Sequence, residues 1–275
     1  MKRYASGLIV LSLGAAVWLA VASSDTAPEA TAGAESAEAK PTPRAADGHP
    51  DLSGFWYRRL AGPVTKRVGK SIVIVNDAPP VEGAGNRYNP GAPKYKQEFL
   101  ARIKEMKDDQ INVDPSFHCG PPGIVRIGPP QRIVHTAREI VVLYDDLNGN
   151  FFRLIPIDGR THREDIEPSA HGDSVGRWEG DTLVIEVRNI LDSTWLGDSG
   201  LFHSADVKVT ERLTRQGDTL KWEAIVEDPE LFEEPWKVTP RTLTLMADGE
   251  IEEAAFCEDR GIADRATGDY HGNVR

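Results

Sequence analysis

Three histidines in the second half of the chain, His162, His171 and His203, are the residues whose chemistry first suggests a function. Imidazole changes its charge near neutral pH, so it can take up and return a proton during a reaction. Asp192 and Asp228 lie in the same irregular segments and offer carboxylates that can orient a histidine. We therefore interpret His171 and His203 as a candidate acid and base pair, oriented by Asp192 or Asp228.

Five further side chains from these segments suit ligand binding. Arg160 could hold an anionic group, His162 could donate or accept a hydrogen bond, and three aromatic residues could line an apolar site: Trp195, Phe202 and Trp236. Each also has a structural interpretation. A histidine in a polar loop often does no more than satisfy hydrogen bonds, and one at the inner face of a strand is usually a core residue.

Several kinds of site are not predicted. The histidines are too far apart in sequence for a compact zinc motif such as H-E-x-x-H, so we expect no metal site. The nearest imitation of a nucleophile elbow is "HGDSVG" with Ser174, but it lies at the start of a strand. Neither a phosphate-binding loop nor a G-x-G-x-x-G motif is present, so we expect no nucleotide cofactor, and none of another kind.

The segments that must position these residues are mostly strands. One helix is predicted over 92–109, where Tyr95, Phe99, Ile103 and Met106 recur at helical spacing. Apolar and β-branched runs around short Gly-containing turns follow it and predict antiparallel hairpins. The predicted fold class is mainly β: an antiparallel meander that forms a lipocalin-like barrel or a related sandwich, with one short N-terminal helix.

In such a meander the connections alternate between two ends. The short turns (145–150, 179–181, 215–218 and 247–250) fall at one end, and the long connections (158–172, 189–202 and 228–237) at the other. Because binding residues concentrate on ordered loops, we expect a site at the long-loop end. Arg177, Glu179 and Asp181 fall at the short-turn end and are interpreted as structural.

Alternation over 203–213 places His203 and Glu211 on one buried face. Eight residues of strand would separate them by roughly 26 Å, so they are not expected to act on each other. The string D-x-x-G-x-W occurs twice, at 51–56 and 173–178. We interpret it as a shared way of starting a strand, with the Gly allowing close packing beside a Trp.

The N-terminal segment predicts export. Residues 1–22 combine Lys2 and Arg3 with an apolar run and a small-x-small ending, which is typical of a signal peptide. Residues 23–47 have the composition of a disordered linker, and 48–275 are long enough for a single β domain. The expected location is periplasmic or secreted, without stable membrane insertion after cleavage.

The formal charge of −11 argues against nucleic acid or an anionic membrane as a partner and leaves a small-molecule ligand or substrate. The composition gives no oligomeric state. Cys119 and Cys257 are the two cysteines, so they form the one possible intramolecular disulfide if the chain is exported, or two buried thiols otherwise.

The motifs "PDLSGFW", "CGPPGIVR", "HGDSVGRWEGDTLVIEV" and "VTERLTR" together resemble a large family of exported bacterial hypothetical proteins. The resemblance spans about residues 50–260 and implies one domain and a pairing of Cys119 with Cys257. It places the three histidines and Trp195 inside family motifs, but this chain departs from the family pattern at "PSAHGD". A similarity of G-x-W to the start of lipocalin-like barrels is a weaker analogy.

Three functions fit these expectations. The first is a small-molecule isomerase, hydratase, lyase or hydrolase that uses a histidine and a carboxylate for acid and base chemistry. The second is a carrier of a small apolar ligand, and the third is an interaction module of the cell envelope. Converging His and carboxylate side chains would favour the enzyme.

Overall fold

The computed structural model describes residues 40–57, 64–68, 71–75, 91–146, 148–254 and 257. The predicted signal peptide, most of the predicted linker and the last 18 residues lie outside this part of the chain. The predicted helix over 92–109 appears as a 3-10 turn η1 (Gln97–Phe99) continued by α1 (Leu100–Asp108). The short α2 (Gln110–Val113) and a second 3-10 turn η2 (Pro115–His118) follow it.

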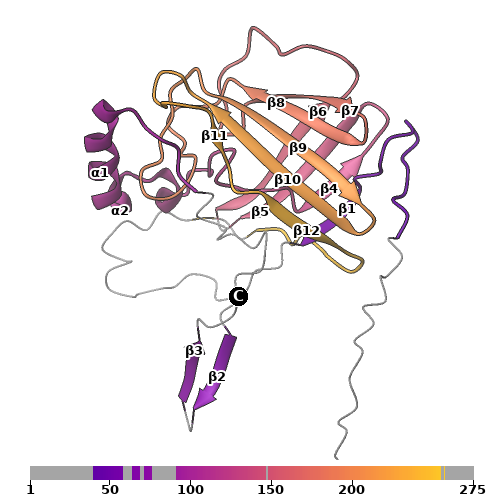
Figure 1. Ribbon diagram of the computed structural model, residues 1–275, viewed down its shortest axis with the longest axis horizontal. Helices are drawn as coiled ribbons and strands as arrows, with labels where there is room; N and C mark the ends of the chain where they lie inside the picture. The colour runs from indigo at the N-terminus through magenta and orange to yellow at the C-terminus, as the bar shows by residue number, and fades with distance from the viewer. Residues whose placement is uncertain are drawn as a thin grey trace, which may run out of the picture. The chain divides into compact units, whose positions relative to one another are not determined.

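The described strands form a nearly closed antiparallel barrel, which confirms the predicted fold class (Figure 1). Around the ring it consists of β1 (Gly54–Tyr57), β4 (Arg132–His135), β5 (Glu139–Asp146), β6 (Gly149–Pro156), β7 (Asp173–Glu179), β8 (Thr182–Arg188), β9 (Lys208–Gln216), β10 (Thr219–Glu227) and β12 (Arg241–Met246). The two-residue β11 (Trp236–Lys237) also pairs with β10. A separate hairpin consists of β2 (Val64–Val68) and β3 (Ser71–Val75).

The ring follows the order of the chain, as expected for a meander, but its opening lies in the middle of the sequence. β1 pairs with both β12 and β4, so the first and last barrel strands are joined by backbone hydrogen bonds. The sheet ends instead at β6 and β7. Side chains close this seam: Arg153 on β6 donates to Ser174 Oγ on β7 at 2.9 Å.

Both copies of D-x-x-G-x-W place their Gly where the chain packs closely. A Cβ on Gly54 would lie 2.3 Å from the side chain of Leu245, and one on Gly176 would lie 2.9 Å from that of Ile157. The corresponding Trp56 is fully buried, and its indole donates to the carbonyl of Leu52 at 2.8 Å. The predicted close packing at both Gly residues is confirmed, but only Gly54 begins its strand, since Gly176 is the fourth residue of β7.

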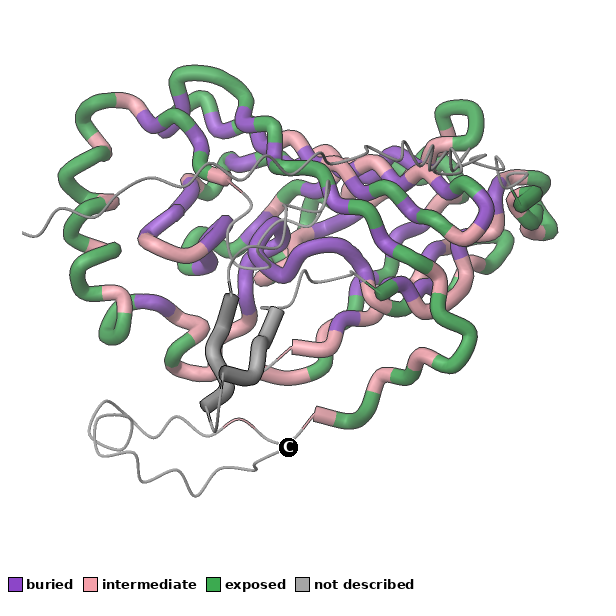
Figure 2. The backbone as a smooth tube through the Cα atoms, turned by 60° about the horizontal axis from the view of Figure 1, so that its bottom comes forward, coloured by how far each residue is buried: buried purple, intermediate pink, exposed green. Residues whose placement is uncertain are grey.

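Inward-facing side chains of the barrel strands form one core. Buried positions alternate with half-buried or exposed ones along β9 and β10, as the period of two requires. Figure 2 shows buried stretches interleaved with less buried ones along the chain. The core contains Trp222, Leu213 and Leu243, but also charged residues that the strands point inward, among them Arg153 and Glu211. The predicted inward position of Glu211 is therefore confirmed.

The strand pairing contradicts part of the predicted grouping of short turns. β6 and β7 run in the same direction, so the turn at 145–150 lies at the opposite end from 179–181 and 215–218, and the connection 158–172 passes from one end to the other. In the described chain no strand follows 247–250, so the last predicted hairpin is not formed there. The turns at 179–181 and 215–218 share one end, as predicted.

Residues 40–53 lie against the end with the turns at 179–181 and 215–218: Lys40 pairs with Asp218 at 2.7 Å, and Arg44 pairs with Asp181 at 2.6 Å. Lys40 and Arg44 belong to the stretch predicted as linker. Their contacts with two of the turns make this end a structural closure.

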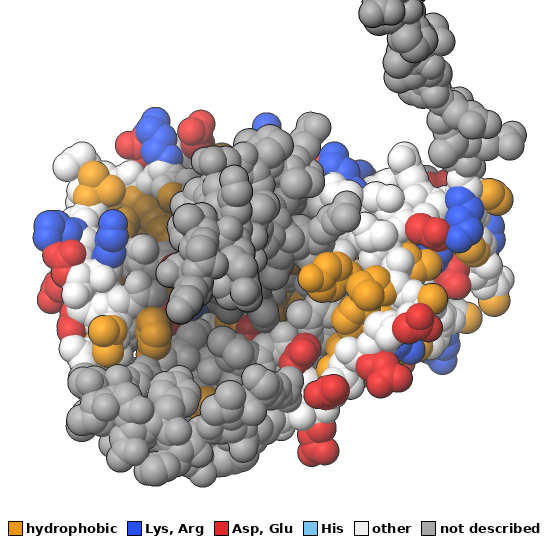
Figure 3. All heavy atoms as spheres, turned by 90° about the horizontal axis from the view of Figure 1, so that it is seen from below, with side chains coloured by type: hydrophobic (Ala, Val, Ile, Leu, Met, Phe, Trp, Pro, Cys, Tyr) orange, Lys and Arg blue, Asp and Glu red, His pale blue; other side chains and the backbone are white. Residues whose placement is uncertain are grey.

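The outer wall of the barrel differs from side to side. On β7, β8 and β9 the outward side chains form an ion-pair network that includes Arg177 with Glu186 and Arg212 with Glu179. On β6, by contrast, Phe152 and Leu154 are 63% and 51% exposed. Seen from below, the described surface carries a group of hydrophobic side chains close to acidic ones (Figure 3).

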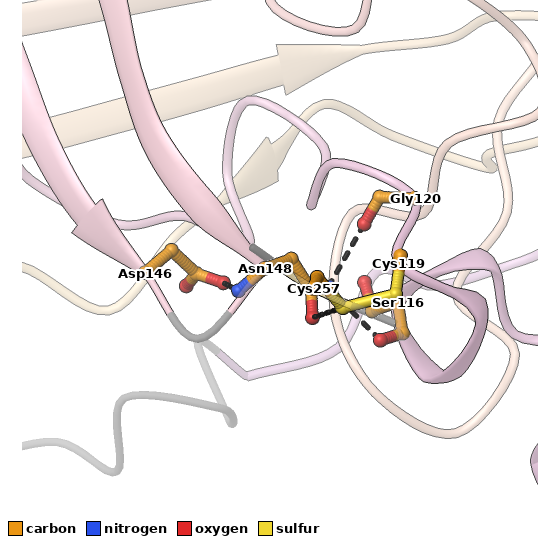
Figure 4. The surroundings of a disulfide bond; sticks show 6 residues. All are labelled: Ser116, Cys119, Gly120, Asp146, Asn148 and Cys257. Carbon is orange, nitrogen blue, oxygen red and sulfur yellow. Dashed lines mark hydrogen bonds between the residues drawn. A yellow bond between two sulfur atoms is a disulfide. The ribbon is translucent and has the colours of Figure 1, made fainter. Parts of the chain in front are cut away.

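The two cysteines form a disulfide, with their Cα atoms 5.7 Å apart, so the alternative of two free thiols is wrong. Asn148, at the turn between β5 and β6, lies beside the disulfide and donates to the carbonyls of Ser116 and Gly120 at 2.9 Å (Figure 4). The bond joins η2 to Cys257 across 138 residues. It fits folding in an oxidising compartment.

Candidate functional site

The first two residues of β7 organise the polar groups at the long-loop end. Because successive side chains of a strand point to opposite faces, Asp173 lies on the outside of the barrel and Ser174 on the inside. Asp173 anchors the long connection between β6 and β7, whereas Ser174 belongs to a buried network around Arg153.

On the outside, Asp173 holds His162 and Arg163. Nδ1 of His162 lies 2.9 Å from Asp173 Oδ2, and the backbone N–H of Arg163 donates to the same oxygen at 3.2 Å. The guanidinium of Arg163 donates to Asp173 Oδ1 through Nε at 2.9 Å and lies within 2.8 Å of it through Nη2. Burial opposes ionisation of this carboxyl, but the hydrogen bonds from His162 and Arg163 outweigh it and lower the pKa of Asp173.

These contacts fix the tautomer of His162. An ionised carboxylate only accepts hydrogen bonds, so Nδ1 must carry a hydrogen and Nε2 of the neutral ring presents its lone pair. The side chain is 16% exposed, and Nε2 is buried and makes no hydrogen bond with any described residue. Among the described histidines, His162 is the one with a carboxylate on one ring nitrogen and no hydrogen bond on the other.

On the inside, the buried Arg153 and Glu211 form an ion pair, with Nη1 and Oε2 2.7 Å apart. Arg153 also donates to the hydroxyl of Tyr144 at 3.1 Å and to Ser174, and Glu211 Oε1 accepts from the indole of Trp222 at 2.8 Å. Burial alone would lower the pKa of Arg153, but Glu211 more than compensates and raises it. Burial raises the pKa of Tyr144 to about 12.

His171 packs beside this inner network rather than beside His203. Its Nε2 donates to the carbonyl of Pro122 at 3.1 Å, and its ring lies against Tyr144 and Phe151, with centroids 6.1 and 5.3 Å apart. Burial, and then the positive charge of Arg153, lower the pKa of His171 to about 4. The ring is therefore neutral at physiological pH.

His203 is 3% exposed, and both of its ring nitrogens are engaged. Nδ1 lies 2.8 Å from the carbonyl of Ser204, and Nε2 lies 3.0 Å from the hydroxyl of Thr194. Burial lowers the pKa of His203, and the hydrogen bond to Ser204 and the nearby carboxylates of Asp228 and Asp192 oppose that shift.

The predicted orienting carboxylates have other positions. Asp228 is buried and accepts from the backbone N–H and the hydroxyl of Ser204 at 2.7 and 3.0 Å, so it holds the chain next to His203. Asp192 is exposed. In the described part of the chain, no hydrogen bond joins His171 to His203, or either of them to Asp192 or Asp228.

The three predicted aromatic ligand contacts are core residues. Trp195, Phe202 and Trp236 are between 3% and 6% exposed. Phe202 stacks on Tyr95 at 5.5 Å and is covered by the guanidinium of Arg102 at 4.1 Å, so the helical segment covers it. Arg160 is exposed, with its Nε 3.9 Å from Asp158 Oδ1.

Sequence reasoning missed Asp173, Arg163 and Arg153. Asp173 is the first residue of β7, and this position is no signal for a partner 11 residues earlier. Arg153 had a usable signal, because it alternates with Phe151 and Ile155 and must share their inward face. An inward Arg together with the inward Glu211 would have predicted a buried ion pair.

No protein-family model, curated protein or solved structure matched this chain. In the described segments, no helix has both the length and the apolar character needed to cross a bilayer. Groups of three or more His, Cys, Asp or Glu residues arranged to hold a metal ion are also not found among the described residues. His162 and Asp173 form the candidate functional site.

Proposed function

We propose that this chain is an exported small-molecule enzyme whose proton-transferring group is His162, held by Asp173 at the long-loop end of the barrel. The supporting observation is the 2.9 Å contact between His162 Nδ1 and the Asp173 carboxylate, together with an Nε2 that has no hydrogen bond to described residues. A carboxylate on one imidazole nitrogen and an unengaged second nitrogen is the arrangement of a general base.

The chemistry follows from this arrangement. Nε2 of the neutral ring takes a proton from the substrate or from a water molecule, and the ring becomes an imidazolium with N–H groups at both nitrogens. The negative charge of Asp173 stabilises that cation, and the same proton is returned later in the cycle. Such proton transfer serves an isomerase, a hydratase, a lyase or a hydrolase.

This proposal moves the catalytic role from His171 and His203 to His162. His171 Nε2 is engaged by a backbone carbonyl, and both nitrogens of His203 face oxygens of its own loop. The proposal of a periplasmic or secreted location rests on the signal-like residues 1–22, and the disulfide supports it. A carrier has less support, because Trp195, Phe202 and Trp236 are buried by the chain itself.

Diethyl pyrocarbonate tests the proposal, because this small electrophile acylates unprotonated imidazole nitrogens. Each histidine of the folded protein is followed over time by peptide mass spectrometry at pH 7. We expect His162 to react several-fold faster than His171 and His203, whose nitrogens are engaged. H162Q should lose only that one modification.

An unreactive His162 in the folded protein, with normal reaction in urea, would contradict the proposal, because a substrate could not reach Nε2 either. A reaction equally fast at all three histidines would contradict it too. Circular dichroism of H162Q controls for loss of the fold.

A further inference from the structure

Two arginines flank the carboxylate that holds His162. Arg163 uses Nε and Nη2 to bind Asp173, but its side chain is 63% exposed and its Nη1 is engaged in no hydrogen bond of the described chain. Arg188 lies directly opposite Asp173 in the pairing of β7 with β8, so both side chains point to the outside of the barrel. Its side chain is 51% exposed.

Arg188 is weakly paired. Its Nη2 lies 3.7 Å from Glu186 Oε2, whereas Arg177 binds the other oxygen of Glu186 closely. Glu164 and Asp165 follow Arg163 in the loop, but in the described chain neither forms an ion pair with Arg163 or Arg188. Arg163 thus binds the Asp173 carboxylate, which is 7% exposed. Arg188 lies opposite Asp173 in the strand pairing, and its ion pair in the described chain is the long one to Glu186.

Arg163 and Arg188 expose two guanidinium groups in a chain whose formal charge is −11. Guanidinium groups bind carboxylate and phosphate oxygens through paired N–H donors, and Arg163 and Arg188 both keep donors directed to solvent. A ligand anion between them would lie next to the carboxylate-held imidazole. The buried Asp173 is already neutralised by Arg163, so it repels such an anion less than an exposed carboxylate would.

We infer that the ligand of the His162 site carries a carboxylate or phosphate group, which Arg163 and Arg188 bind. This inference rests on the proposed function and names the substrate class of the same site. Arg188 is the specificity-determining residue in this arrangement, because Arg163 is also required to hold Asp173. The role first assigned to Arg160 thus belongs to Arg163 and Arg188.

The test is an NMR titration of the full folded chain, labelled with ¹⁵N, with three probes at constant ionic strength: sodium benzoate, inorganic phosphate and uncharged benzyl alcohol. We expect saturable shifts of the His162 ring and of the Arg163 and Arg188 Nε–H signals with benzoate, phosphate or both. Benzoate alone assigns a carboxylate ligand, and phosphate alone assigns a phosphate ligand. Benzyl alcohol should cause no saturable shift.

R188Q should weaken binding of the anion about tenfold, because one charge-assisted contact is lost. R212Q is the matched control: it removes one positive charge from the same outer wall, at a side chain that is 38% exposed and pairs with Glu179 rather than Glu186, and should leave the affinity unchanged. Equal weakening by both variants, or no saturable shift with either anion, would overturn the inference. Neither of these results contradicts the proposed function if His162 still reacts fastest with diethyl pyrocarbonate. If His162 does not react fastest, the proposed function is contradicted whatever the titration shows.

Discussion

Asp173 and Ser174 are neighbours in sequence and anchor two polar clusters on opposite sides of one strand. Inside the barrel, Ser174 belongs to a network in which the charged groups of Arg153 and Glu211 neutralise each other. Outside, Asp173 holds an imidazole and a guanidinium that both keep unused hydrogen-bonding capacity. The inner charges are thus paired with each other, whereas the outer cluster has an imidazole nitrogen without a hydrogen bond to the described residues and an exposed guanidinium.

The difference between the two clusters shows how charged residues with a structural role can be told from charged residues that are candidates for binding. Perturbed pKa values alone do not single out the outer cluster, since the largest shifts belong to Tyr95, Arg153, His171 and Tyr144, none of which lies in it. Those shifts arise from burial and from partners that already use the available donors. Neither Glu211 Oε2 nor His162 Nε2 makes a hydrogen bond in the described chain, but Glu211 Oε2 is paired with the charge of Arg153, whereas His162 Nε2 has no such partner.

The largest expected effect comes from breaking the inner cluster. E211Q removes the charge that compensates the buried Arg153, and an uncompensated buried charge costs about 3 to 5 kcal/mol. Urea unfolding at pH 7 measures the loss. E223Q on the neighbouring β10, at an exposed pair with Lys221, should change stability by less than about 0.5 kcal/mol. Similar losses for both variants would show that the inner pair contributes no more than a surface pair.

The pH dependence of stability provides the next test of the inner cluster. The pKa of His171 falls from about 6.5 in the unfolded chain to about 4 in the folded one. Below pH 6.5 the unfolded chain binds a proton at His171 more readily than the folded chain does. The free energy of unfolding therefore decreases as the pH falls to 4. The loss is on the order of 2 to 3 kcal/mol.

H171Q should flatten this part of the curve of unfolding free energy against pH between 6.5 and 4. Because burial also lowers the pKa of His203, some acid dependence should remain in the variant. Parallel curves for H171Q and the unsubstituted protein would show that His171 titrates normally.

Much of the fold follows from the sequence because hairpins are local. Turns such as Glu179–Gly180–Asp181 set the register of the flanking strands. The alternation of connections is correct from β7 to β10 but not across β6 and β7, which run in the same direction. The opening between β6 and β7 is not predictable in this way. It depends on which strands pair across long sequence separations, as β1 does with β12.

The candidate site was predictable in location but not in its members. His162 does lie in one of the long connections. As expected for the site, a carboxylate holds the histidine ring. Loop conformation decides which carboxylate meets which ring, and spacing in sequence contains no information about it. His203 meets Thr194 and Ser204, and only the folded loops bring His162 to Asp173.

The smallest effects on stability are expected from substitutions of Ser174 and Asp173. These substitutions also give the clearest contrast between the inner and the outer cluster. S174A should cost about 1 to 2 kcal/mol, because buried donors of Arg153 lose their acceptor, and it should leave the reaction of His162 with diethyl pyrocarbonate unchanged. D173N should cost only about 1 kcal/mol, because the guanidinium of Arg163 can turn to water, yet it should slow that reaction several-fold. D173N removes the negative charge that makes Nε2 of His162 more nucleophilic. The reverse pattern would be labelling of His162 that changes in S174A and does not change in D173N. It would show that the inner cluster determines the reactivity of His162, and it would contradict the distinction between the two clusters.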